Sequence, residues 1–246
     1  MNDQTRVLLI GGTEEARLVN AVLEELEGVK LVTSLAGRTE IPAELKGLVV
    51  TGGFGGADGL AGFLDENNIQ WVVDASHPYA AKITQTAASV CRAKEISYIR
   101  FQRPPWEATT GDQWISVPTI MEAAPALAEY ARVFLSVGRQ ELEHFADLTD
   151  KFFLARSIEK VIFEPVGSKT LFIQDRGPFK MDDEIALLQR HQVDVVVSKN
   201  SGGAATFAKI VAARTLQLPV IMIDRPIVPK VSTLATVEDV IALFRS

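Results

Sequence analysis

A chain of 246 residues, 47% apolar and 23% charged, has the size and balance of one large or two small globular α/β domains. A net charge of −6 argues against a general nucleic-acid binder, the single cysteine Cys91 excludes an internal disulfide framework, and a core of this size needs no metal. No apolar run reaches the roughly 18 residues of a membrane span, and the polar N-terminus is unlike a signal peptide, so we expect a soluble, cytoplasmic protein without a membrane partner.

Short apolar runs alternate with helical patterns through the first half of the chain. We expect strands at 6–10, 30–34, 48–51, 71–75 and 97–101, and helices at 14–26, 58–67 and 80–94. This alternation predicts βαβ units around a parallel sheet. The strands are almost continuous Val, Leu and Ile, which indicates that both faces of the sheet are covered.

The segment 102–117 interrupts the alternation, and its prolines favour an extended backbone. We interpret it as a crossing between an N-terminal domain, 1–112, and a C-terminal domain, 113–246. The second domain has predicted strands at 133–137, 152–157, 170–174, 195–198 and 220–223, with helices at 184–191 and 204–216. Pro125 should kink or shorten a helix predicted over 120–130.

A glycine turn joins the first strand to the first helix, at Gly11, Gly12 and Thr13. Such a turn directs free helix N–H groups at a phosphate, although a tight structural turn alone would look the same. NAD-binding sheets carry an acidic residue about 20 positions further on, at the end of the second strand. Here that place has no carboxylate and holds Ser34, Leu35, Ala36, Gly37 and Arg38. A serine and an arginine suit a ribose 2′-phosphate, so the sequence favours NADPH over NADH.

The third strand ends in a second glycine-rich turn that includes Gly53, Phe54, Gly55 and Gly56. So many glycines are costly in chain entropy, which indicates that a ligand approaches the backbone closely. The turn lies at the carboxyl end of a strand, where open α/β sheets bind their ligands. We therefore add these residues to the predicted cofactor site.

The fourth strand ends at the same sheet edge, with Ser76, His77 and Tyr79. His77 titrates nearest neutrality and is our candidate proton donor, with Tyr79 or water as rivals. The alternative is that His77 only orients the loop or caps the next helix. Ser76 and His77 are also assigned to the cofactor site.

Three strand ends of the second half each bring a cation: Arg139, Arg176 and Lys199. The last of these loops opens a predicted helix, and it contributes Asn200, Ser201, Gly202 and, two turns in, Lys209. Free helix N–H groups and several cations at one edge favour an anionic ligand. Each cation taken singly could equally be an ordinary surface charge.

Taken together, these motifs resemble the precorrin-6A reductase family of the cobalamin (vitamin B12) pathway. The resemblance rests on 10–13, 34–38, 52–56, 74–80, 103–106, 138–141, 176–179 and 198–203, and it covers almost the whole chain. One departure is Tyr79, where the family leads us to expect phenylalanine.

The resemblance implies two Rossmann-like domains with parallel sheets, and it allows an exchange of a strand between them. It implies an NADPH-dependent oxidoreductase that reduces one macrocycle carbon–carbon double bond of precorrin-6A to give precorrin-6B. The cations of the second half would then bind the carboxylates of this tetrapyrrole, and the product could pass to neighbouring pathway enzymes. Two alternatives stay open: a cobalt-precorrin-6A reductase of the anaerobic pathway, and a non-enzymatic NADPH-binding redox sensor.

Overall fold

The computed structural model describes residues 4–35, 45–158 and 169–245. The chain forms two compact units: the first comprises 1–104 and 227–246, and the second comprises 105–226. Each unit contains one six-stranded sheet in which every strand pair is parallel. Both are α/β units, as the alternation in the sequence predicts.

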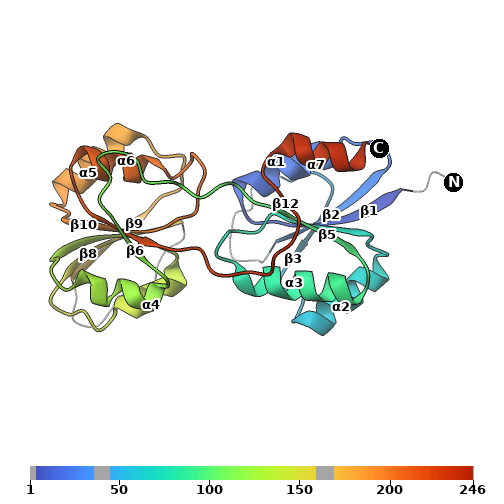
Figure 1. Cartoon of the computed structure of the whole chain (residues 1–246), viewed down its shortest axis with the longest axis horizontal. Helices are drawn as coiled ribbons and strands as arrows, with labels where there is room; N and C mark the ends of the chain where they lie inside the picture. Colours follow the sequence, from blue (N-terminus) through green and yellow to red (C-terminus); the bar gives the residue numbers. More distant parts are fainter. Residues whose placement is uncertain (1–3, 36–44, 159–168, 246) are drawn as a thin grey trace. The chain divides into compact units, whose positions relative to one another are not determined.

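The sheet of the first unit has the order β12-β5-β4-β1-β2-β3. Its strands are β1 (Thr5–Ile10), β2 (Val29–Leu35), β3 (Leu48–Thr51), β4 (Trp71–Asp74), β5 (Ser97–Phe101) and β12 (Thr233–Leu234). Helices α1 (Glu14–Leu23) and α7 (Val237–Phe244) cover one face, and α2 (Ala57–Glu66) and α3 (Ala81–Ala93) cover the other (Figure 1).

Strand β1 shows why this sheet is buried on both sides. Val7 and Leu9 pack into the cluster beneath α1 and α7, whereas Leu8 and Ile10 pack into the cluster beneath α2 and α3. Successive side chains of a strand point to opposite faces, so a continuous apolar run serves both layers.

The second unit repeats this arrangement with the strand order β6-β11-β10-β7-β8-β9. Its strands are β6 (Trp114–Val117), β7 (Arg132–Ser136), β8 (Phe152–Ser157), β9 (Lys169–Gln174), β10 (Val195–Lys199) and β11 (Val220–Ile223). Its helices are α4 (Ile120–Ala123), α5 (Met181–Arg190) and α6 (Ala208–Thr215), with the 3-10 helices η1 (Pro125–Leu127) and η2 (Arg139–Phe145). Helix α4 ends just before Pro125, as expected for a residue that cannot continue a helix.

The units divide the chain differently from the expected boundary after residue 112. The break lies after Pro104, and the C-terminal segment from Ile227 returns to the first unit. There β12 pairs with β5, while β6, the strand that follows β5 in the sequence, pairs with β11 in the second unit. Four elements, β6, η2, β12 and α7, were not predicted from the sequence; β6 lies in the Pro- and Gly-rich crossing, and β12 is only two residues long.

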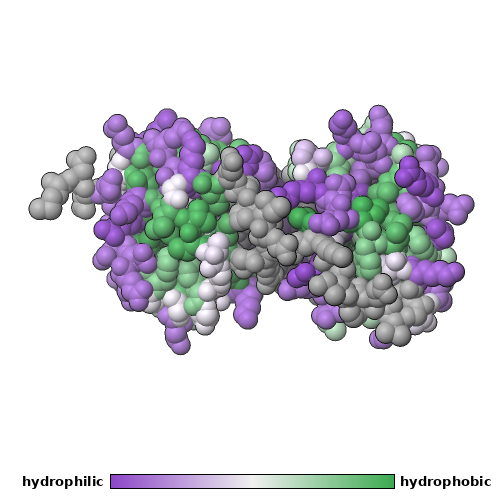
Figure 2. Space-filling view, turned by 180° about the vertical axis from the view of Figure 1, so that it is seen from behind, coloured by the Kyte–Doolittle hydropathy of each residue, from purple (hydrophilic) through white to green (hydrophobic). Residues whose placement is uncertain are grey.

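On the face drawn in Figure 2, each unit has apolar side chains in its middle and hydrophilic side chains around them. Several of the exposed apolar side chains lie on or next to outer strands, among them Leu48 on β3 and Leu171 on β9. Within the described part of the chain, no helix is both long enough and apolar enough to cross a bilayer.

Candidate functional site

Each sheet has one point at which the strand order reverses. In the first sheet, β1 is followed outward by β2 and β3 on one side, while β4 and β5 lie on its other side. In the second sheet the same reversal lies between β7 and β10. Open α/β sheets bind ligands beyond the carboxyl ends of the strands at such a point. The fold therefore indicates one candidate site in each unit.

Thr13 connects the two loops that meet at the reversal of the first sheet. Its hydroxyl donates to the Ala75 carbonyl at 2.9 Å and accepts the Ala16 N–H at 3.1 Å, which makes Thr13 the N-cap of α1. The Gly11 N–H donates to the Ser34 carbonyl at 2.8 Å. The predicted cofactor residues after β1, on β2 and after β4 are thus brought together.

The glycines of the two turns leave backbone open to a ligand. Gly12 has a φ of +114°, a conformation that other residues rarely adopt. Gly53 has no left-handed φ, and no atom lies within 4 Å of the position that a Cβ would occupy there, so the fold itself does not require glycine. The backbone at Gly53 is therefore accessible on the side where a Cβ would lie.

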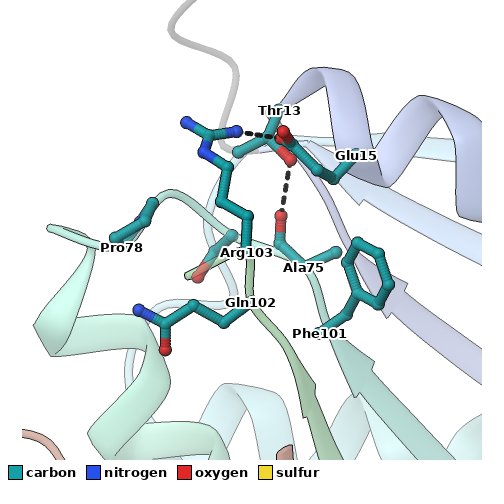
Figure 3. A pocket seen from close by; sticks show the side chains of 8 residues that line it. Thr13, Glu15, Ala75, Pro78, Phe101, Gln102 and Arg103 are labelled. Carbon is teal, nitrogen blue, oxygen red and sulfur yellow. Dashed lines mark hydrogen bonds and ion pairs between the residues drawn. The ribbon is translucent and has the colours of Figure 1, made fainter. Parts of the chain in front are cut away.

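The first-unit site contains a small pocket between the three loops that follow β1, β4 and β5. It is lined by Thr13, Glu15, Ala75, Ser76, Pro78, Phe101, Gln102 and Arg103. Arg103 and Glu15 point toward each other across it and form an ion pair (Figure 3). No role was predicted from the sequence for Glu15, Gln102 or Arg103, because only the fold brings the start of α1 next to the segment after β5.

A buried carboxylate holds the loop after β4. Asp74 is fully buried and accepts hydrogen bonds from the Thr84 hydroxyl at 2.7 Å, the Tyr98 hydroxyl at 2.7 Å and the Ser76 N–H at 3.0 Å. Burial and the Asp74 carboxylate raise the pKa of the Tyr98 hydroxyl far above its usual range, and they raise the pKa of the Cys91 thiol to about 12. Both groups therefore stay protonated near neutral pH, and Cys91 is an unreactive thiol.

His77 and Tyr79 follow this anchored segment. The His77 Nδ1 accepts the Tyr79 N–H at 3.3 Å, and the two rings lie 5.7 Å apart between centroids. A histidine whose Nδ1 accepts a hydrogen bond carries its proton on Nε2 when neutral. Proton donation from Nε2 requires the imidazolium form of the ring, in which Nδ1 is also protonated and no longer accepts the Tyr79 N–H.

In the second unit, two predicted cations lie at or beside the reversal between β7 and β10. Arg139 follows β7 and is exposed, whereas Lys199 ends β10 and forms an ion pair with Glu141. The Lys199 and Glu141 side chains are 15% and 26% exposed, so the pair lies half within the surface. Arg176 follows β9, two strands away from β7, and is exposed.

The remaining residues of the predicted anion site have structural partners. Asn200 accepts the Trp106 N–H at 2.8 Å and donates to the Trp106 carbonyl at 3.0 Å, so its amide fixes the incoming chain. Lys209 is 4% exposed, donates to the Thr206 carbonyl at 2.8 Å, and lies 5.0 Å from the centre of the Trp106 ring. Its ammonium therefore lies inside the unit, not on an exposed rim.

The loop that follows β10 also differs from the expected helix start. Ser201 is 8% exposed, Gly202 has a φ of +68°, and the carbonyls of Asn200 and Ser201 accept hydrogen bonds from Arg225. Helix α6 begins only at Ala208, so its first N–H groups lie several residues beyond this loop. The prediction of a helix from residue 204 was wrong, because a turn occupies 205–207.

A buried ion pair supports the Arg176 loop. Arg156 and Glu184 are 6% and 3% exposed, and two hydrogen bonds of 3.1 and 2.6 Å join them. The Arg156 guanidinium also lies 4.1 Å from the centre of the Phe179 ring. Strand β8 and helix α5 are thereby tied to the loop that carries Arg176.

Part of the predicted cofactor site lies outside the described residues, namely Ala36, Gly37 and Arg38. Of the other predicted cofactor residues, Ser34 is 4% exposed at the end of β2, next to Leu35. Phe54 packs against Phe63 of α2, and Gly55 and Gly56 lead into that helix.

Comparison with known proteins gives one consistent result. Residues 6–245 match the family model described as precorrin-6x reductase CbiJ/CobK. A precorrin-6A reductase of Rhodococcus erythropolis is 44% identical over 237 residues, which is 96% of this chain and 94% of that protein. A cobalt-precorrin-6A reductase of Priestia megaterium is 29% identical over 247 residues, which is 96% of each chain. A solved structure named CobK precorrin-6A reductase superimposes with a TM-score of 0.91 at 38% identity, covering 98% of this chain and 96% of that one.

Proposed function

Because the chain belongs to the precorrin-6x reductase CbiJ/CobK family, we propose that it uses NADPH to reduce one macrocycle carbon–carbon double bond of precorrin-6A, giving precorrin-6B. The observation that carries this proposal is the match over residues 6–245, which includes the loops at both sheet reversals. The activity is thus that of an oxidoreductase in cobalamin biosynthesis.

The first unit is the proposed cofactor site. The open backbone at Gly12 and Gly53 and the amide groups at the start of α1 fit a dinucleotide diphosphate. When bound, the nicotinamide supplies the hydride. The choice of NADPH over NADH rests on the absence of a carboxylate from residues 34–38 and on Arg38, which suit a 2′-phosphate.

Reduction of the double bond also needs a proton on the neighbouring carbon. We assign it to His77, through Nε2, with Tyr79 as the second candidate. Asp74 would act as a positioning residue, because its carboxylate fixes the Ser76 N–H directly before His77.

The second unit is the proposed substrate site. Arg139, Arg176 and Lys199 lie at the carboxyl edge of its sheet, where cations fit a ligand with many carboxylates. Arg139 and Arg176 are exposed, whereas Lys199 is largely buried and paired with Glu141. The cobalt-containing substrate is the second candidate, since a protein named for it is 29% identical; the 44% identity to a precorrin-6A reductase favours the metal-free one.

The decisive experiment follows NADPH oxidation with precorrin-6A and, separately, with its cobalt complex. We expect turnover with the metal-free macrocycle, NADPH preferred to NADH, and conversion to precorrin-6B by mass spectrometry. Turnover with the cobalt complex alone would assign the chain to the anaerobic reaction. Tight NADPH binding without oxidation in either mixture would instead favour a redox sensor.

A further inference from the structure

Helix α1 begins with two acidic residues at the place where a diphosphate should bind. Glu14 and Glu15 occupy its first turn, directly after the Gly11–Gly12–Thr13 turn. The amide groups and dipole of a helix N-terminus attract any anion, a carboxylate as well as a phosphate. The two glutamate carboxylates and the diphosphate of a bound dinucleotide would therefore interact with the same helix N-terminus.

The two carboxylates have different surroundings. Glu14 is 56% exposed and pairs with Arg17 one turn along the same helix. Glu15 is 22% exposed, lines the pocket, and pairs with Arg103, whose side chain is 18% exposed. The Glu15 Oε2 that faces Arg103 is shielded from solvent, so screening by water and salt is weak there.

Arg103 reaches the start of α1 from a different part of the fold. It follows β5, next to Gln102, and its guanidinium lies above the Thr13–Ala75 hydrogen bond that joins the β1 and β4 loops (Figure 3). A guanidinium binds phosphate oxygens in the same forked manner as carboxylate oxygens. Arg103 thus has the position and the chemistry to bind either group.

We propose that Arg103 is a binding residue for the cofactor diphosphate and that Glu15 competes with the diphosphate for its guanidinium. This inference rests on the proposed dinucleotide site of the first unit. The ion pair then lowers the affinity for the cofactor in two ways. The Glu15 carboxylate repels the diphosphate, and the Arg103 guanidinium has to leave Glu15 before it can bind the diphosphate.

The test measures the NADPH dissociation constant of the whole protein without substrate, by calorimetry at one fixed low salt concentration. We expect Glu15→Gln to bind NADPH about fivefold more tightly and Arg103→Ala to bind it at least about tenfold more weakly, where tenfold corresponds to about 1.4 kcal/mol. Arg103→Lys, which keeps the charge without the fork, should lie between Arg103→Ala and the wild type. Glu14→Gln removes the same charge from the same helical turn outside the pocket, and it should change affinity less than about twofold.

Binding of a second ligand without a diphosphate shows whether the two variants act on the diphosphate or on another part of the cofactor. Adenosine 2′-monophosphate carries the 2′-phosphate but no diphosphate, so its affinity should be the same in the wild type, Glu15→Gln and Arg103→Ala. Equal changes for both ligands, or no tightening of NADPH binding by Glu15→Gln, would overturn the inference while leaving the cofactor site in place. A wild-type protein that binds no NADPH would overturn the proposed function together with it.

Discussion

At the sheet reversal of the first unit, the loops after β1 and β4 meet through backbone groups, glycines and one threonine hydroxyl. At the corresponding reversal of the second unit, the carboxyl ends of β7 and β10 carry charged side chains, and Lys199 is already paired with Glu141. The strand orders are equivalent, so topology alone does not set the kind of ligand. Backbone N–H groups suit a diphosphate of fixed shape, whereas spaced cations suit carboxylates spread around a macrocycle.

The largest expected effect concerns the Arg156–Glu184 pair of the second unit, which is more deeply buried than the Arg103–Glu15 pair of the first. Arg156→Ala should lower the free energy of unfolding by about 3–5 kcal/mol, because it leaves the Glu184 carboxylate buried without a partner. Urea denaturation monitored by circular dichroism measures this loss. The double variant Arg156→Met, Glu184→Leu is the control and should recover most of the stability; a single variant as stable as the wild type would contradict the assigned role.

His77→Asn tests whether a residue of the first unit donates the proton in the reduction. If His77 donates the proton, kcat should fall about 100-fold, because a positioned acid contributes about 100-fold or more. Single-turnover kinetics at several pH values measures the step. Tyr79→Phe is the matched control from the same turn, and a wild-type rate in His77→Asn together with a slow Tyr79→Phe would move the role to Tyr79.

Arg38→Ala tests the choice between NADPH and NADH that the sequence after β2 predicts. NADPH should bind about tenfold or more weakly, because a charge-assisted bond to the 2′-phosphate is lost, whereas NADH affinity should hardly change. Fluorescence titration with both dinucleotides gives the ratio. A similar loss for NADPH and NADH would show that Arg38 does not read the 2′-phosphate.

The smallest effects are expected in the second unit, where charge is shared among several residues. Arg139→Ala should raise the KM for the tetrapyrrole about three- to tenfold and leave NADPH affinity unchanged, because it removes one partly hydrated contact among several. Lys199→Ala should have a smaller effect, since the Lys199 side chain is less exposed than that of Arg139. Steady-state kinetics with varied substrate distinguishes them, and a change in NADPH affinity with a constant KM would reverse the assignment of the two units.

Much of this molecule could be predicted from local sequence. The alternating apolar runs define ten of the strands and the parallel α/β class, because strands covered on both faces need continuous Val, Leu and Ile. The glycine turn at Gly11 and Gly12 and the His77 loop were predicted at the correct strand ends, since a strand that ends in such residues marks the ligand edge of a parallel sheet.

The tertiary structure decided the rest, because the contacts concerned join residues far apart in the chain. The pairing of β12 with β5 places the C-terminal segment from Ile227 in the first unit, and no local pattern in the sequence predicts this pairing. Burial of Lys209 beside Trp106 and the pairing of Lys199 with Glu141 determine which predicted cations lie at the surface. The proximity of Glu15 and Arg103, which are 88 positions apart, comes from the neighbouring ends of strands in the sheet, and no local pattern encodes it.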